Sequence, residues 1–229
     1  MTAFRDIHSH FVYGIDDGAK DRETMEKMLD AAYRDNIGRL IATPHMSPGI
    51  QAFDMELFKS HYKQAQEYCI KKAYEIELLY GAENLYTPAL PGYAESHDLV
   101  TLADSRYLLL EFVPDESVEE IAFAVDFLSA RGYIPVIAHV ERYGNLSFRD
   151  IKRLSDGYKV FFQMNCGTVI KDRGLISGRK SRRLLKSGLI SCLGCDAHDL
   201  HRRPFNMNEA YAVIEKEYGQ ELANKLCVN

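Results

Sequence analysis

Short apolar runs alternate along the chain with longer stretches in which apolar residues recur at three- and four-residue steps. The longer stretches predict amphipathic helices, because that spacing places apolar side chains on one helical face. The short runs predict buried strands, and their alternation with helices indicates parallel βαβ units. The predicted strands cover residues 4–7, 39–42, 75–80, 107–112, 134–138, 160–164 and 189–193, and the predicted helices cover residues 21–36, 54–72, 117–131, 147–157, 178–187 and 206–217.

The polar residues at the strand ends favour a closed barrel over an open, doubly wound sheet. Nearly every predicted strand ends in His, Asp or Glu. A barrel gathers the ends of all its strands at one rim, whereas an open sheet concentrates its site at one switch point. No interior stretch is rich in Pro, Gly or Ser, so we expect one α/β domain over residues 1–229. The prediction is a seven-stranded (β/α) barrel.

Composition narrows the class of protein and its surroundings. With 229 residues, 46% of them hydrophobic, the chain can bury a sizeable core. A net charge of −5 gives no general attraction to nucleic acid or anionic lipid. Neither a signal peptide nor a bilayer-spanning run is present, which predicts a cytoplasmic protein without membrane insertion. Cys192 and Cys195 are expected to be buried, reduced thiols.

Two pairs of candidate metal ligands lie at opposite ends of the chain. In "DIHSH", His8 and His10 end the first predicted strand, and a two-residue step places both imidazoles on one face. Two such imidazoles can chelate one metal ion. In "CDAHD", Asp196 and His198 repeat this spacing after the last predicted strand. Closure of the barrel would make the two pairs neighbours.

Four of the five intermediate strands contribute one candidate ligand each. Any single case is equally a strand-capping polar residue, but the repetition at successive strand ends favours metal binding. Burying several carboxylates together without cations would cost about several kcal/mol each. Asp17 is either a further ligand or the cap of a turn at Gly18. The candidates at the intermediate strand ends are His45, Glu83, Glu111 and His139.

The charge of this set predicts more than one metal and an anionic substrate. Asp17, Glu83, Glu111 and Asp196 carry four negative charges, which two divalent ions balance and a third exceeds. A positive site suits a phosphate. Imidazole and carboxylate ligands without thiolate suit Mn, Fe, Zn or Ni. Metals roughly 3.5–4 Å apart can clamp a phosphoryl group and supply hydroxide, so we expect a metal-dependent hydrolase.

Arginines flank the candidate ligands. Arg142 lies three residues after His139, and Arg202 and Arg203 follow His198. They are either bidentate phosphate ligands or partners in salt bridges at the rim. Three tyrosines in the same loops are candidates to flank an aromatic substrate, with ordinary loop positions as the alternative: Tyr13, Tyr86 and Tyr143.

The motifs together resemble those of the polymerase and histidinol phosphatase superfamily. The matching blocks are "DIHSH", "DDG", "TPH", "GAE", "LLEF", "AHVERY" and "DAH", between Phe4 and Pro204. Within the superfamily the chain is similar to bacterial manganese-dependent protein-tyrosine phosphatases of capsule and exopolysaccharide operons. The resemblance implies a distorted seven-stranded (β/α) barrel with up to three metals, manganese first, with iron or zinc as alternatives.

The resemblance also implies roles for individual residues. His8, His10, Glu83 and Asp196 would hold one metal. A second metal would lie between His45, Glu83, Glu111 and His139. Asp17 and His198 would join a third. Arg142 and Arg203 would bind phosphate, and the general acid is either His198 or a metal-bound water.

The implied substrate is phosphotyrosine in the tail of a membrane tyrosine autokinase that controls polysaccharide export. Two alternatives remain open. One is another phosphoesterase of the same superfamily, a histidinol phosphatase or a nuclease-like phosphodiesterase. The other is a catalytically silent metal-binding partner of the kinase. The chain departs from the family pattern between His198 and Pro204, where Asp199, His201 and Arg202 replace less charged residues.

Overall fold

The computed structural model describes residues 3–171 and 178–228. Its strands are paired in parallel throughout, in the orders β1-β2-β4 and β3-β5-β6-β7-β8-β9. The strands are β1 (Phe4–Asp6), β2 (Ile37–Ala42), β3 (His45–Met46), β4 (Glu77–Tyr80), β5 (Glu83–Leu85), β6 (Tyr107–Glu111), β7 (Ile134–Ile137), β8 (Phe161–Asn165) and β9 (Cys192–Gly194).

The two sheets join into one strongly curled barrel of seven strand positions. β3 follows β2 and β5 follows β4 after breaks of two residues each. Across these breaks, the Gly81 amide donates to the Ala42 carbonyl at 2.8 Å and the Glu83 amide to the Pro44 carbonyl at 3.0 Å. The Asp196 amide bonds the His8 carbonyl at 2.8 Å, which connects the last strand to the first. The predicted distorted (β/α) barrel is therefore confirmed.

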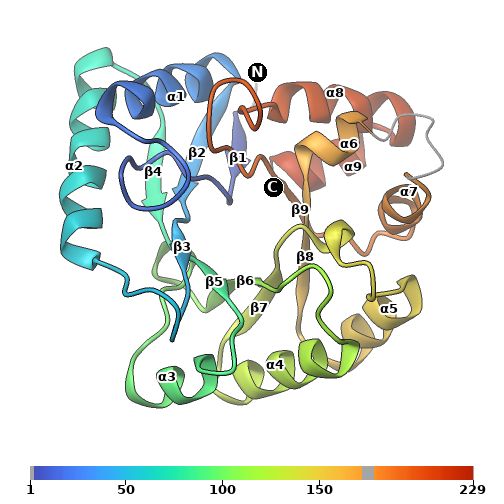
Figure 1. Cartoon of the computed structure of the whole chain (residues 1–229). Helices are drawn as coiled ribbons and strands as arrows, with labels where there is room; N and C mark the ends of the chain where they lie inside the picture. Colours follow the sequence, from blue (N-terminus) through green and yellow to red (C-terminus); the bar gives the residue numbers. More distant parts are fainter. Residues whose placement is uncertain (1–2, 172–177, 229) are drawn as a thin grey trace.

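Helices surround the curled sheet (Figure 1). All six predicted helices form, with boundaries shifted by a few residues, and three short helices were not predicted: α3, α6 and α9. The helices are α1 (Arg22–Arg34), α2 (Met55–Lys72), α3 (Leu90–Ser96), α4 (Val118–Ala130), α5 (Phe148–Gly157), α6 (Cys166–Lys171), α7 (Arg179–Lys186), α8 (Met207–Tyr218) and α9 (Gln220–Cys227), with 3₁₀ turns η1 (Leu102–Asp104) and η2 (Val140–Arg142).

The first helix shows how local sequence and packing agree. Asp21 caps α1 by accepting a hydrogen bond from the Thr24 amide, which satisfies a free N–H of the first turn. The helix buries one apolar stripe against the barrel: Met25, Met28, Leu29 and Ala32. None of the described helices is long and apolar enough to span a bilayer.

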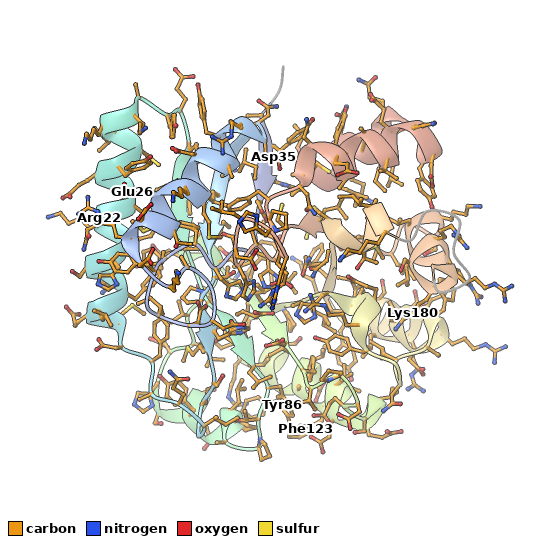
Figure 2. The ribbon with its side chains drawn as sticks, turned by 45° about the horizontal axis from the view of Figure 1, so that its top comes forward. Arg22, Glu26, Asp35, Tyr86, Phe123 and Lys180 are labelled. Carbon is orange, nitrogen blue, oxygen red and sulfur yellow. The ribbon has the colours of Figure 1, made fainter. Side chains whose placement is uncertain are left out.

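Asp35, at the end of α1, ties this helix to the start of α8 (Figure 2). Its carboxylate accepts hydrogen bonds from the amides of Met207 at 2.6 Å and Asn208 at 3.2 Å. The N-cap residue of α8, Asn206, makes no such bond with its own side chain. A carboxylate distant in sequence therefore caps α8.

The cysteines are all free and buried. Burial raises the pKa of the Cys192 thiol to about 12. The prediction of buried, reduced thiols at Cys192 and Cys195 is confirmed.

Candidate metal centre

The end of β1 places two imidazoles inside the barrel rim. The rings of His8 and His10 lie 5.3 Å apart, centroid to centroid, and both are buried. Between them, the Ser9 hydroxyl donates to the Ile41 carbonyl at 2.7 Å, which fixes the strand end. A Cβ at Gly18 would lie 2.1 Å from the His10 carbonyl oxygen, so only glycine lets the "DDG" loop approach this strand.

Glu83 lies at the centre of the cluster. Its Oε2 is 3.2 Å from His8 Nε2, 3.3 Å from His10 Nε2 and 3.1 Å from His45 Nδ1. Its Oε1 is 2.9 Å from His139 Nε2. Burial alone would raise the pKa of Glu83, but the adjacent imidazoles outweigh it and hold the pKa well below its usual range. An ionised carboxylate therefore faces four imidazoles.

Asp196 and Glu111 lie on either side of Glu83. Asp196 Oδ1 is 3.5 Å from His8 Nε2 and 3.6 Å from His10 Nε2. Glu111 Oε1 lies 3.4 Å from His139 Nε2. Both carboxylates thus share imidazole neighbours with Glu83.

Asp17 and His198 form the outer part of the cluster. Asp17 Oδ1 lies 3.3 Å from His198 Nε2 and 3.3 Å from His45 Nε2. Asp17 is 60% exposed at its side chain, whereas His198 is buried. Asp17 therefore reaches inward from the surface, and the carboxylate that accepts the Gly18 amide in the turn is that of Asp16.

Every predicted ligand is thus brought to one place. Ligand atoms within 4.8 Å of one another form three groups: His8, His10 and Asp196; His45, Glu83 and Glu111; and His10, Asp17, His45 and His198. His139 completes the cluster through Glu83 and Glu111.

The donor set fits divalent metal ions. Four buried atoms in the cluster have no hydrogen-bond partner: His8 Nε2, His10 Nε2, Glu83 Oε2 and His198 Nε2. Buried polar atoms without partners are costly, and cations bound among them would satisfy all four. Imidazole nitrogens and carboxylate oxygens are suitable ligands for Mn, Fe or Zn.

The protonation of the imidazoles follows their neighbours. Burial lowers the pKa of His139, but hydrogen bonds to Glu111 and Glu83 outweigh it and raise the pKa to about 9. For His198, burial and the positive charge of His10 act together and lower the pKa to about 4. His198 is therefore neutral at neutral pH, and neutral imidazole is the metal-binding form.

Two ligands have backbone conformations that the sequence did not indicate. His139 has a φ of 31° and Asp196 a φ of 53°, in the left-handed region that side chains other than glycine rarely adopt. Each such residue costs of order 1 kcal/mol or more and persists where its surroundings impose it. Here both residues are the strand-end ligands themselves.

Asp16 supports the cluster, although the sequence pattern indicated only its neighbour Asp17. Its Oδ2 lies 2.7 Å from His10 Nδ1 and accepts the His45 amide at 3.1 Å, while its Oδ1 accepts the Gly18 amide. Burial raises the pKa of Asp16, but the bond to His10 dominates and the pKa falls to about 2. The second Asp in "DDG" was the available signal.

Strand β8 contributes two further supports that were missed. Gln163 Oε1 accepts the His139 amide at 2.7 Å and lies 3.2 Å from His8 Nδ1. Asn165 donates to Asp196 Oδ2 at 2.9 Å. Polar residues two apart in an apolar run were the signal, because they share one face of the strand.

Of the two alternatives for the rim tyrosines, burial excludes a place beside the substrate for Tyr86 and Tyr143. Tyr143 is 1% exposed, and its hydroxyl accepts the Phe112 amide and lies 3.4 Å from His139 Nδ1. Tyr86 is 6% exposed and donates to Glu120 of α4 (Figure 2). Both rings are part of the core, because the barrel packs helices over these loops.

Two of the predicted arginines reach the cluster. Arg142 donates to Asp196 Oδ2 at 2.7 Å, and Arg203 donates to Asp17 Oδ2 at 2.9 Å. Their side chains remain 42% and 38% exposed. Arg202 instead bonds Asp199 through its backbone amide. The candidate ligands thus have guanidinium groups at their solvent edge.

Two cavities flank the cluster, and we name them by their charge. The acidic cavity, about 670 Å³, is lined by Gly14, Ile15, Asp16, Asp17, Lys20, His45, Ser47, Gln51, Leu85 and Glu111. The cationic cavity, about 440 Å³, is lined by Arg142, Asn165, Gly167, Thr168, Lys171, Cys195, Asp196, His201, Arg202, Arg203, Pro204 and Asn206.

Known proteins resemble this chain over nearly its full length. It is 32% identical to the tyrosine-protein phosphatase CpsB of Streptococcus pneumoniae, covering 98% of this chain and 95% of that protein. It is also 32% identical to the tyrosine-protein phosphatase YwqE of Bacillus subtilis, covering 98% and 89%.

Structural similarity agrees with these relatives. A chain from the crystal structures of YwqE and CpsB, described as unique metal-dependent tyrosine phosphatases, superposes with a TM-score of 0.86 and 31% identity, covering 95% of this chain and 89% of that chain. A histidinol phosphate phosphatase of Lactococcus lactis shares the fold at 12% identity and a TM-score of 0.56.

The sequence family described as "Capsular polysaccharide synthesis, CpsB/CapC" matches residues 4–229. The chain therefore belongs to the CpsB/CapC family of capsular polysaccharide synthesis.

Proposed function

We propose that this chain is a metal-dependent protein-tyrosine phosphatase. It removes phosphate from phosphotyrosine in the tail of a membrane tyrosine kinase that regulates capsular or exopolysaccharide synthesis, and it acts in the cytoplasm. The observation that carries the proposal is the set of four buried, unpartnered nitrogen and oxygen atoms inside a cluster of imidazoles and carboxylates. The named relatives supply the substrate class.

The geometry supports two or three metal positions. Glu83 would bridge two of them, because its two oxygens face different imidazoles. The first group of ligands is His8, His10, Glu83 and Asp196; the second is His45, Glu83, Glu111 and His139; the third adds Asp17 and His198. Manganese is the proposed metal, with iron or zinc compatible with the same donors.

The metals would lower the pKa of a bound water and so supply the nucleophile, and they would stabilise charge on the leaving phenolate. The chain's own residues bind and orient the substrate. The Arg142 and Arg203 guanidinium groups are placed to hold phosphate oxygens bidentately. Asp16 and Gln163 hold the His10 and His8 rings in position. We favour His198 as a ligand over a general acid, because its Nε2 is buried without a hydrogen-bond partner and lies 3.3 Å from Asp17 Oδ1.

The test is hydrolysis of a phosphotyrosine peptide by the purified chain with Mn²⁺, before and after chelation. We expect activity to be lost in excess EDTA and restored by Mn²⁺. Full turnover in EDTA would contradict the mechanism. Metal content without turnover of any phosphoester would instead support a silent binding partner.

A substrate panel separates the proposal from other activities of this fold. We expect phosphotyrosine peptides to be preferred over histidinol phosphate and oligonucleotides. The similarity to histidinol phosphatases supports the shared barrel and no more, because identity is below 15%. A preference for histidinol phosphate would replace the proposed function.

A further inference from the structure

The cationic cavity is lined by more positively charged side chains than the two arginines that we assign to phosphate binding at the metal centre. Arg142 and Arg203 have carboxylate partners in Asp196 and Asp17. Lys171, at the end of α6, and Arg202 also line the cavity. Among residues 3–171 and 178–228, no carboxylate oxygen lies within 4.0 Å of the charged group of either one.

Two carboxyl groups that contact lining residues of the cavity are already engaged. Asp199 accepts the backbone amides of His201 and its two successors, so it serves the turn that carries Arg202. Glu141, behind the cavity wall, accepts bonds from the Thr168 hydroxyl at 2.9 Å and the Asn165 amide at 3.1 Å.

The cavity is continuous with the metal centre. Asp196, a candidate ligand, lines it together with Arg142 and Arg203, the residues placed to hold phosphate. Lys171 and Arg202 add to this positive lining. Cations around a concave surface repel one another, and an anion that enters the cavity relieves this repulsion. An anionic group bound in the cationic cavity would therefore be part of the same substrate molecule whose phosphate lies at the metal centre.

We propose that the cationic cavity is a specificity subsite for a second anionic group of the substrate. That group is a carboxylate or phosphoryl group on a residue close to the phosphotyrosine, and Lys171 and Arg202 bind it. The inference rests on the proposed function and adds a preference for acidic substrate sequences. Arg202 lies in the segment between His198 and Pro204 that departs from the family pattern, so the preference is expected to be particular to this chain.

The experiment compares three phosphotyrosine peptides that differ only near the phosphotyrosine, with neutral residues, glutamates or a second phosphotyrosine. We expect kcat/KM to be higher for both anionic peptides. Lys171→Ala and Arg202→Ala should each reduce this preference roughly three- to fivefold, as expected for solvent-accessible ion pairs. Arg202→Glu should abolish or reverse it. Turnover of para-nitrophenyl phosphate, which has no second anionic group, should not change.

The matched controls are Lys186→Ala and Lys186→Glu, at an exposed cation of α7 outside the cavity. They change net charge equally and should leave the preference intact. Equal effects of Lys186→Glu and Arg202→Glu would overturn the subsite, because they would indicate a general field. Weaker inhibition by inorganic phosphate in Arg202→Ala, with unchanged peptide preference, would also overturn it, because the cavity would then hold only product.

The pattern across the three peptides separates the two proposals. If none of the three phosphotyrosine peptides is hydrolysed, the proposed function fails and the subsite fails with it. If all three peptides are hydrolysed at equal rates, the proposed function stands and only the subsite is overturned.

Discussion

The two cavities beside the ligand cluster differ in charge, although they share one rim. The acidic cavity presents Asp16, Asp17 and Glu111 against a single lysine. The cationic cavity presents Lys171 and three arginines against a single carboxylate, Asp196. Carboxylates attract metal ions, and arginine and lysine attract phosphate and carboxylate. On the proposed function, metal binding would draw on the carboxylates of the acidic side and recognition of the anionic substrate on the cationic side, with the candidate ligand Asp196 lining the cationic cavity as well.

The largest effect is expected from Glu83→Gln, which removes the charge shared by both groups of ligands. Removing one partner of a buried charge network costs about 3–5 kcal/mol, or roughly a hundredfold or more in affinity. We expect loss of at least two metal ions, measured by elemental analysis, together with loss of phosphatase activity. Glu77→Gln, at an exposed residue of β4 paired with Arg39, is the matched control. Retention of full metal content would refute the bridging role.

Asp16→Asn tests the acidic side through a residue that touches ligands. The change removes the charge that holds His10 Nδ1 at 2.7 Å. Such supporting partners typically contribute about 10- to 100-fold in metal affinity. We expect weaker Mn²⁺ affinity in a chelator competition, with activity recovered at high Mn²⁺. A defect that persists at saturating Mn²⁺ would instead assign Asp16 to substrate handling.

Arg142→Lys tests the cationic side. Lysine keeps the charge but loses the bidentate guanidinium, so loss of one charge-assisted hydrogen bond should raise KM about tenfold. Metal content should not change, and Arg153→Lys on the exposed face of α5 is the control. A drop in metal content would show that Arg142 also supports metal binding, through its contact with Asp196, and would contradict separate roles for the two cavities.

The smallest effect is expected from substitution of Asp35. This residue caps α8 next to Asn206, which lines the cationic cavity. Asp35→Ala should lower the free energy of unfolding by about 1 kcal/mol, as for loss of a helix cap. Metal affinity should be unaffected, because Asp35 contacts no candidate ligand in the described structure. Loss of metal affinity would show that the residues around the cationic cavity also hold the candidate metal ligands in position.

Asp35 also gives a pH dependence of stability. Burial raises its pKa from 3.8 to about 6 in the folded protein. The folded state therefore binds the proton more tightly than the unfolded state. As a result, the contribution of Asp35 to the free energy of unfolding falls as pH rises from 3.8 to about 6. In denaturant titrations across the window, Asp35→Asn should lack this component. An identical pH profile for the variant would contradict the shift.

The local sequence pattern predicted the strands and the candidate ligands, because short apolar runs mark the strands and polar residues at their ends mark the ligands. His8 and His10 share a face at a two-residue step, and the remaining candidates end successive strands. The breaks after β2 and β4 were not predicted, since apolar periodicity does not report pairing between strands. Helices α3 and α6 were missed because runs of six or seven residues contain too few turns to show a period.

The supporting contacts were beyond sequence reasoning for a different reason. Gln163 lies 155 residues from His8 along the chain, yet the two side chains meet in the folded protein. Tyr143 has an ordinary rim-loop position in the sequence, and only packing shows that its hydroxyl lies beside His139. Such pairs are set by barrel closure, which no local window contains.

The sequence by itself determined the barrel class, the identity of the candidate ligands and the chemistry open to them, because residue type and strand spacing are local properties. The family resemblance already placed Glu83 in two groups of ligands and selected Arg203, and the tertiary structure added the distances that put Glu83 among four imidazoles and Arg203 beside Asp17. Only the tertiary structure decided that charge divides between two cavities. It also imposed the left-handed backbone at His139 and Asp196. These features depend on distances between strands that meet only when the barrel closes.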